Sequence, residues 1–158
     1  MNYPQTFAKE VAQNIQAIGN YGCLAMCYLY SVGIDGDSEN YIRAVSQSMD
    51  YSKKLPAPQK FIDEECTILN ASAYLEYHTG KRFEVIKHNY TSIEQIKNPT
   101  PVRFEYLNPE NNKKYSHWVV VENGKIVFNS LINSSCISRG KLAQDSKNPN
   151  ARIIRLAK

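Results

Sequence analysis

The hydrophobic pattern changes its period near Pro101, and this change limits the fold more than any other feature. Before Pro101, apolar residues recur with the spacing of helices, first at Phe7, Val11, Ile15 and Ile18. After it, apolar and polar residues alternate as they do in strands. Helices followed by strands are typical of an α+β domain, in which N-terminal helices pack on an antiparallel β-sheet.

Capping residues and turn signals divide the chain further. The pattern predicts helices over 5–17 and from Cys23 to Ser31 or Val32, a third beginning at Asp37 or Ser38, one from Asn70 to Tyr77, and a short one over 92–97. It predicts a loop over 51–59 and a helical turn within 61–69. The expected strands are 82–87, 102–107, 116–122, 125–129 and 152–156, with a hairpin turn at Asn123-Gly124.

Length and charge restrict the class of protein. The 158 residues suit a single domain over residues 1–158. The net charge of +4 comes from scattered Lys and Arg, so we expect no nucleic-acid partner. No apolar run is long enough for a membrane span, and residues 1–10 lack the apolar segment of a secretion signal. We therefore expect a cytoplasmic protein without a membrane partner, whose four cysteines are free thiols.

Cys23 follows Gly22 at the start of an expected buried helix. Unpaired backbone N–H groups and the helix dipole favour thiolate there, which predicts a lowered pKa and a nucleophile. His117 begins an expected strand, and Asn129 ends the next one. Nucleophile, base and orienting amide are the parts of a cysteine hydrolase.

Four short motifs carry a resemblance to the papain superfamily. They are Tyr21-Gly22-Cys23-Leu24-Ala25-Met26-Cys27, Pro101-Val102-Arg103-Phe104, Ser116-His117-Trp118-Val119-Val120-Val121 and Val127-Phe128-Asn129-Ser130-Leu131. Within that superfamily the chain is most similar to peptidases that process double-glycine leader peptides, and to uncharacterised bacterial and phage relatives. The resemblance implies a papain-like cysteine peptidase fold.

The resemblance also implies roles for single residues. Cys23 would be the nucleophile, His117 the general base and Asn129 the residue that orients the imidazole. Gln16 would donate to the oxyanion, with Asn20 as the substitute, and the backbone N–H of Cys23 could be the second donor.

The hairpin register decides between Asn129 and Ser130. A two-residue turn at Asn123-Gly124 sets Ser130 opposite His117, whereas a three-residue loop with Gly124 as a bulge residue sets Asn129 there. Hydrophobic alternation favours the first register and the resemblance favours Asn129, so we predict a bulge.

The expected function is thiol-dependent hydrolysis of amide bonds in a peptide or protein substrate, through an acyl-enzyme, with no metal or organic cofactor. Cys23 and Cys27 lack a second ligand pair for zinc, so core packing explains Cys27 better than a role as a zinc ligand does. Asp63-Glu64-Glu65 should raise the thiol pKa of Cys66. A catalytically silent papain-like binding or regulatory module and a phage-type cell-wall amidase stay open as alternatives. The oligomeric state cannot be read from the sequence.

Overall fold

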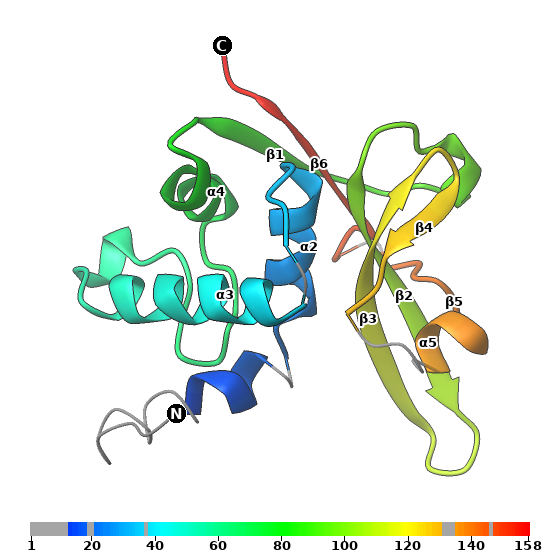
Figure 1. Ribbon diagram of the computed structural model, residues 1–158. Coiled ribbons are helices and arrows are strands. Elements are labelled where there is room, and N and C mark those ends of the chain that lie inside the picture. The colour runs from blue at the N-terminus through cyan, green and yellow to red at the C-terminus, as the bar shows by residue number, and fades with distance from the viewer. Residues whose placement is uncertain (1–12, 19–20, 37, 131–134, 146) are drawn as a thin grey trace.

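The computed structural model describes residues 13–18, 21–36, 38–130, 135–145 and 147–158. Helices occupy the first half of this chain and an antiparallel sheet occupies the second half, with the two side by side (Figure 1). The mixed α+β architecture predicted from the change of period is confirmed. In the part of the chain that is described, no helix has both the length and the apolar character needed to cross a membrane.

The helical half is built around α2. Residues 13–18 are helical, followed by α2 (Cys23–Ser31), α3 (Ser38–Lys53), the 3-10 turn η1 (Ala57–Gln59) and α4 (Ala71–Thr79). The short α5 (Ser135–Ser138) and the 3-10 turn η2 (Ile93–Gln95) lie among the strands of the second half of the chain. Helix α2 contacts α3 and α4 on one side and strands β2 and β3 on the other. Its central residues are buried, as its uniformly apolar sequence predicts.

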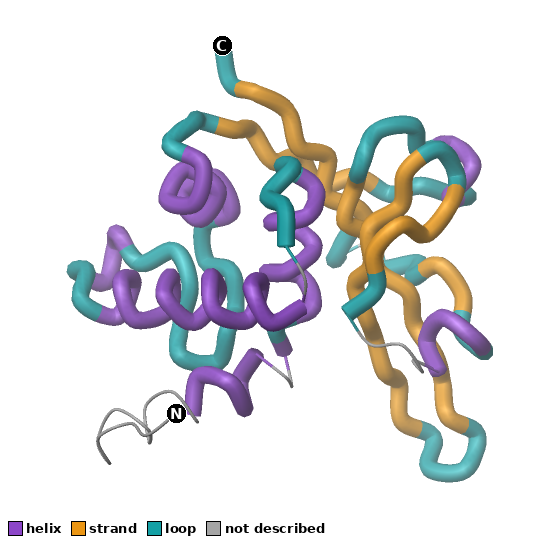
Figure 2. Tube along the Cα trace, in the orientation of Figure 1, coloured by secondary structure: helices purple, strands orange, loops and turns teal. Residues whose placement is uncertain are grey.

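The sheet has a strand order that differs from the order along the chain. Its strands are β1 (Phe83–His88), β2 (Thr100–Asn108), β3 (Lys113–Glu122), β4 (Lys125–Phe128), β5 (Lys141–Leu142) and β6 (Ala151–Leu156). The order is β1-β6-β2-β3-β4, and β5 pairs with β2. The last strand therefore lies inside the sheet, where it joins β1 to β2 (Figure 2).

Side chains on the two faces of β3 enter different cores. Trp118 and Val120 pack with Cys27 on the face toward α2, whereas Val119 and Val121 pack with Ile96 on the opposite face. This alternation follows from the two-residue period of a strand. It places His117, two residues before Val119, on the face away from α2.

Most element predictions are confirmed where the chain is described. Helix α2 runs over Cys23–Ser31, and α4 is capped by Asn70, whose Oδ1 accepts from the N–H of Ala73 at 3.0 Å. Gly80 ends α4 with a φ of 72°. The helix expected over 5–17 is helical over 13–18, and the rest of it lies outside the described residues.

Two predictions between the helices are wrong. The loop expected over 51–59 contains the last turn of α3 and η1. The helical turn expected within 61–69 is an extended excursion in which Ile62 bridges Ile68. Backbone groups are satisfied there without a helix, because Ser52 Oγ accepts from the N–H groups of Phe61 and Ile62 at 3.0 and 3.3 Å.

Candidate active site

Gly22 allows α2 to start directly against the preceding helical segment. Its N–H donates to the carbonyl oxygen of Ile18 at 2.7 Å. A Cβ at this position would lie 2.5 Å from that oxygen and 2.8 Å from Cγ2 of Ile18, so only glycine fits without a shift. Cys23 is thus fixed as the first residue of α2.

Among the described residues, no strand pairs with β3 at the edge where the thiol of Cys23 lies. The N–H and carbonyl of Arg103 point toward Asn150 and Ala143, away from β3, with bonds of 2.8 and 3.0 Å. Arg103 pairs with Trp118, so the backbone groups of Trp118 point to the other edge of β3. Pairing with β4 begins only at Val120. At this edge a backbone hydrogen bond from Trp118 acts to lower the pKa of the Cys23 thiol.

His117 and Asn129 are joined as the sequence analysis predicts. Nε2 of His117 lies 2.7 Å from Oδ1 of Asn129, and His117 is buried. An amide oxygen only accepts hydrogen bonds, so Nε2 carries the proton and the lone pair of the neutral ring lies on Nδ1. Nδ1 is therefore the atom that can act as a base.

The hairpin brings Asn129 to His117, but its turn and its bulge differ from the prediction. The turn has two residues, since Glu122 pairs with Lys125, and both Asn123 and Gly124 have positive φ, at 51° and 73°. The bulge expected at Gly124 is instead in β4, where the register shifts between Val120 and Val121 and leaves Val127 unpaired.

This register changes the predicted partner of Asn129. Val121 pairs with Ile126, and Val120 pairs with Phe128. Continued past Phe128, this register sets Asn129 opposite Val119. The prediction that Asn129 lies directly opposite His117 is therefore wrong. The shift of one residue nevertheless turns Asn129 to the face of His117, because side-chain direction alternates along a strand. The 2.7 Å contact is a diagonal one.

The prediction that the start of α2 lowers the pKa of Cys23 is wrong. Burial raises the pKa of the thiol, and this outweighs backbone hydrogen bonds from Trp118, Leu24 and Cys23 itself, which lower it. Burial also lowers the pKa of His117, although the Asn129 hydrogen bond opposes that shift. The resting site therefore favours a neutral thiol and a neutral imidazole.

The structure does not bring every predicted residue to this site. Gln16 is exposed in the helical segment 13–18, and none of the hydrogen bonds among the described residues joins it to Cys23. Asn20 lies outside the described residues. No side-chain hydrogen bond between Cys23 and His117 occurs in the described chain either. By the alternation along β3, His117 points to the face away from α2, the helix that carries Cys23.

Comparison of the chain with models of known protein families, with curated proteins and with solved structures found no match. The resemblance to the papain superfamily therefore depends on the motifs in the sequence.

The other cysteines are buried. Cys27 packs with Trp118 and Val120, which confirms its predicted core position. The pKa of Cys66 is raised to about 12, mainly by burial and less by the charges of Cys23 and Asp63, so the predicted direction is confirmed with a different main cause. Cys136 lies in α5. Cys23 is thus the most accessible of the four thiols.

Sequence reasoning missed the part of Trp118. The sequence identifies Trp118 only as part of a motif, yet its backbone acts to lower the pKa of the Cys23 thiol and its ring packs with Cys27 of α2. No local pattern could reveal this, because the direction of a backbone N–H depends on which edge of β3 is paired. The pairing of Arg103 with Trp118 fixes that direction.

Proposed function

We propose that the protein is a papain-like, thiol-dependent hydrolase of amide bonds in peptides or proteins. The observation that carries the proposal is the 2.7 Å contact of Asn129 with His117, next in the chain to Trp118, whose backbone acts to lower the pKa of the Cys23 thiol. These residues have the chemistry of a nucleophile, a base and an orienting group.

The proposed reaction follows from the assigned protonation states. Nδ1 of His117 takes the proton of the Cys23 thiol as Sγ attacks the carbonyl carbon. The imidazolium then gives that proton to the leaving amine as the C–N bond breaks. Water, deprotonated by Nδ1, attacks the thioester, and the acid is released with the thiol restored. Asn129 keeps the proton on Nε2 throughout, so Nδ1 stays available.

Cys23 and His117 are both neutral before the reaction, which affects when the thiolate forms. Since burial raises the pKa of Cys23 and lowers that of His117, the reactive thiolate forms during attack and not before it. The N–H groups of Trp118 and Leu24 at Sγ favour that thiolate once the proton has moved.

A catalytically silent binding module is the second candidate. The raised pKa of Cys23, the exposed Gln16 and the missing thiol–imidazole hydrogen bond favour it. A pair of electrophiles separates the two functions. Alkylation by iodoacetamide needs no proton donor, whereas opening of an epoxysuccinyl ring by Sγ breaks a C–O bond whose oxygen must take a proton from an acid.

The experiment compares wild type, His117→Gln and Cys23→Ala by intact mass and peptide mapping. We expect the epoxysuccinyl probe to modify Cys23, with a rate roughly a hundredfold lower in His117→Gln. The rate of iodoacetamide labelling should fall much less in His117→Gln. Cys23→Ala should abolish labelling by both reagents. Equal loss, or no loss, with the two reagents in His117→Gln would identify the silent module.

A further inference from the structure

A cavity of about 360 Å³ lies between α2, the segment before α4, and strands β1 and β6. Its volume is within the range of sites for small ligands. Leu24 is part of the cavity wall, so the wall includes the residue next to the candidate nucleophile Cys23. Its lining comprises Leu24, Tyr28, Ile68, Leu69, Asn70, Ala71, Ser72, Val85, Lys87 and Arg152.

Two cations in this lining face each other without an acid. Lys87 and Arg152 are direct partners across β1 and β6, and like charges at such positions disfavour a sheet. Arg152 is only 6% exposed, although arginine is almost never fully buried without a partner. Among the described residues, no carboxylate lines the cavity and no ion pair includes Lys87 or Arg152.

Neutral groups orient Arg152 without neutralising it. Nη1 donates to the carbonyl oxygens of Pro149 and Ala151 at 2.8 and 3.0 Å, and Nη2 donates to Oδ1 of Asn148 at 2.9 Å. The guanidinium carbon lies 4.8 Å from the centre of the Trp118 ring. These contacts fix the guanidinium in one place, and Arg152 belongs to the cavity lining.

A third cation lies near Arg152 but outside the cavity lining. Arg103 is 7% exposed, its guanidinium carbon lies 6.0 Å from the same Trp118 ring, and its buried Nε has no hydrogen-bond partner. Burial lowers the pKa of Arg152, Tyr28 opposes this, and the charge of Arg103 lowers it further. The cluster thus carries charge that the described chain does not compensate.

The start of α4 faces the same cavity. Asn70 caps this helix through the N–H of Ala73, while the N–H groups of Ala71 and Ser72 belong to the first turn and have no acceptor within the helix. All three residues before Ala73 line the cavity. The positive end of the helix dipole therefore adds to Lys87 and Arg152.

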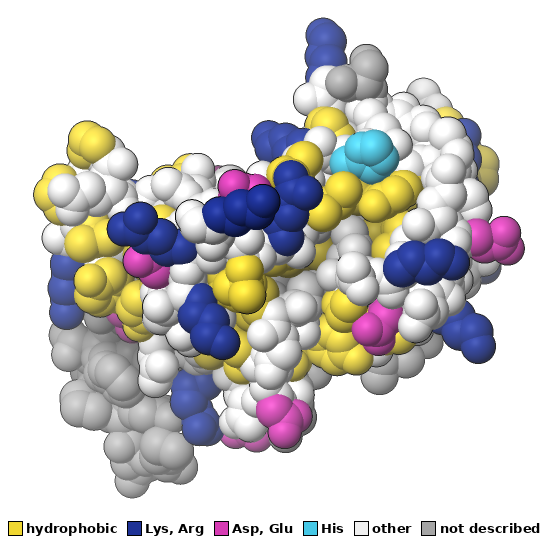
Figure 3. Space-filling model, turned by 90° about the horizontal axis from the view of Figure 1, so that it is seen from above, with side chains coloured by type: hydrophobic (Ala, Val, Ile, Leu, Met, Phe, Trp, Pro, Cys, Tyr) yellow, Lys and Arg dark blue, Asp and Glu magenta, His cyan; other side chains and the backbone are white. Residues whose placement is uncertain are grey.

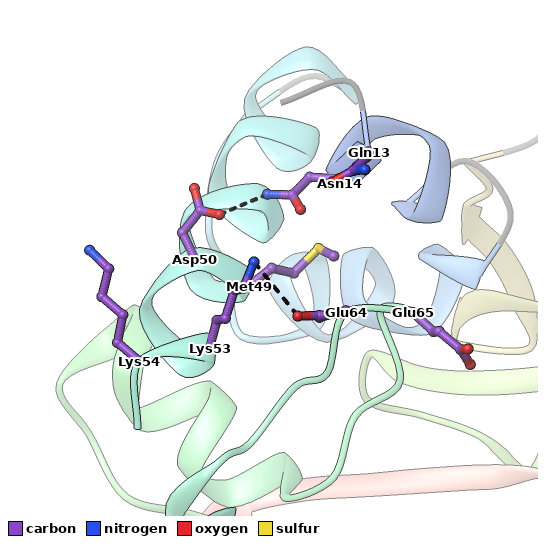
Figure 4. A pocket seen from close by; sticks show the side chains of 8 residues that line it. All are labelled: Gln13, Asn14, Met49, Asp50, Lys53, Lys54, Glu64 and Glu65. Carbon is purple, nitrogen blue, oxygen red and sulfur yellow. Dashed lines mark hydrogen bonds and ion pairs between the residues drawn. The ribbon is translucent and has the colours of Figure 1, made fainter. Parts of the chain in front are cut away.

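A larger hollow of about 810 Å³ shows a different charge balance (Figure 4). There Lys53 Nζ pairs with Glu64 Oε1 at 3.6 Å, and Asn14 donates to Asp50 at 3.0 Å. Its charges are mixed and partly paired, whereas the smaller cavity has cations alone. Seen from above, several dark-blue Lys and Arg side chains lie across the middle of this face, with magenta Asp and Glu side chains among them, and others are spread toward its edges (Figure 3).

We propose that this cavity binds an oxyanion, the carboxylate or phosphate group of a small ligand, between Arg152, Lys87 and the start of α4. The apolar remainder of that ligand packs on Leu24, Tyr28 and Val85. An oxyanion supplies the negative charge that the cross-strand pair lacks, and it accepts from the N–H groups of Ala71 and Ser72. The site needs no activity of Cys23.

The test titrates the full chain, as Cys23→Ser, with inorganic phosphate, glutarate and uncharged glutaramide. Isothermal titration calorimetry measures affinity, and NMR amide shifts locate the bound anion. We expect phosphate or glutarate to bind at millimolar concentration, to shift the Ala71 and Ser72 amides, and to exceed glutaramide. The anion that binds more tightly identifies the ligand group. Because Cys23 is absent, the result is independent of the proposed hydrolase.

Charge variants complete the test. Lys87 is exposed, so Lys87→Met should leave the fold intact and weaken anion binding roughly fivefold. Lys87→Glu should weaken it further, and Lys81→Met, an exposed lysine outside the lining, should not change it. The proposal is overturned if neither anion binds, if glutaramide binds equally well, or if Lys81→Met weakens binding as much as Lys87→Met.

Discussion

Replacing Gly22 by alanine should disturb both the fold and the thiol. The new Cβ would lie 2.5 Å from the Ile18 carbonyl oxygen, 2.8 Å from its Cγ2 and 2.9 Å from its Cα. Two of these atoms are backbone, so α2 must move away from residues 13–18. Overpacking of this kind costs about 1–3 kcal/mol, and the lower backbone entropy of alanine in the unfolded chain offsets about 0.4–1 kcal/mol.

The net loss of about 1–2 kcal/mol should lower Tm by about 2–8 °C for a chain of 158 residues. Circular dichroism during heating measures Tm, and iodoacetamide labelling reports the exposure of Cys23, which should change.

Gly33→Ala is the matched control at the other end of α2. Its φ of +82° makes alanine strained, by about 1–2 kcal/mol, but its Cβ meets nothing within 4 Å. That variant should lose stability with unchanged Cys23 labelling. An unaltered Tm and labelling rate in Gly22→Ala would refute the close-approach argument.

Two further predictions concern histidines. Asn129→Ala removes the hydrogen bond that raises the pKa of His117, so its NMR titration midpoint should fall below that of wild type, while Asn129→Asp should raise it; equal midpoints would exclude the contact. Burial lowers the pKa of His78 from 6.5 to about 4. The unfolded chain therefore binds more protons between these values, and stability should fall as the pH drops from 6.5 to 4. His78→Phe keeps the ring contacts with Tyr74 and Tyr77 and should flatten that fall in Tm, unlike the exposed-site control His88→Phe.

Local signals were sufficient wherever neighbouring residues decide the backbone. The uniformly apolar run after Gly22 predicted α2, Asn70 predicted the cap of α4, and Asn123-Gly124 predicted the hairpin. In each case the deciding hydrogen bond or φ angle lies within a few residues of its cause. The same local patterning was enough for the α+β class, since period-two alternation after Pro101 requires strands.

Tertiary structure decided how these elements meet. The last strand lies between β1 and β2, which sets Lys87 opposite Arg152, and no local pattern reports a partner that far along the chain. The excursion over 61–69 escaped prediction for the same reason, because Ser52 satisfies its backbone from another element.

The site shows both contributions. Sequence alone named Cys23, His117 and Asn129 and required a bulge to turn Asn129 toward the histidine. The structure decided that the bulge is in β4 and that the contact is diagonal. It also reversed the predicted pKa shift of Cys23, because the loss of solvent around a thiol depends on everything that packs over it, whereas the helix start is a local feature.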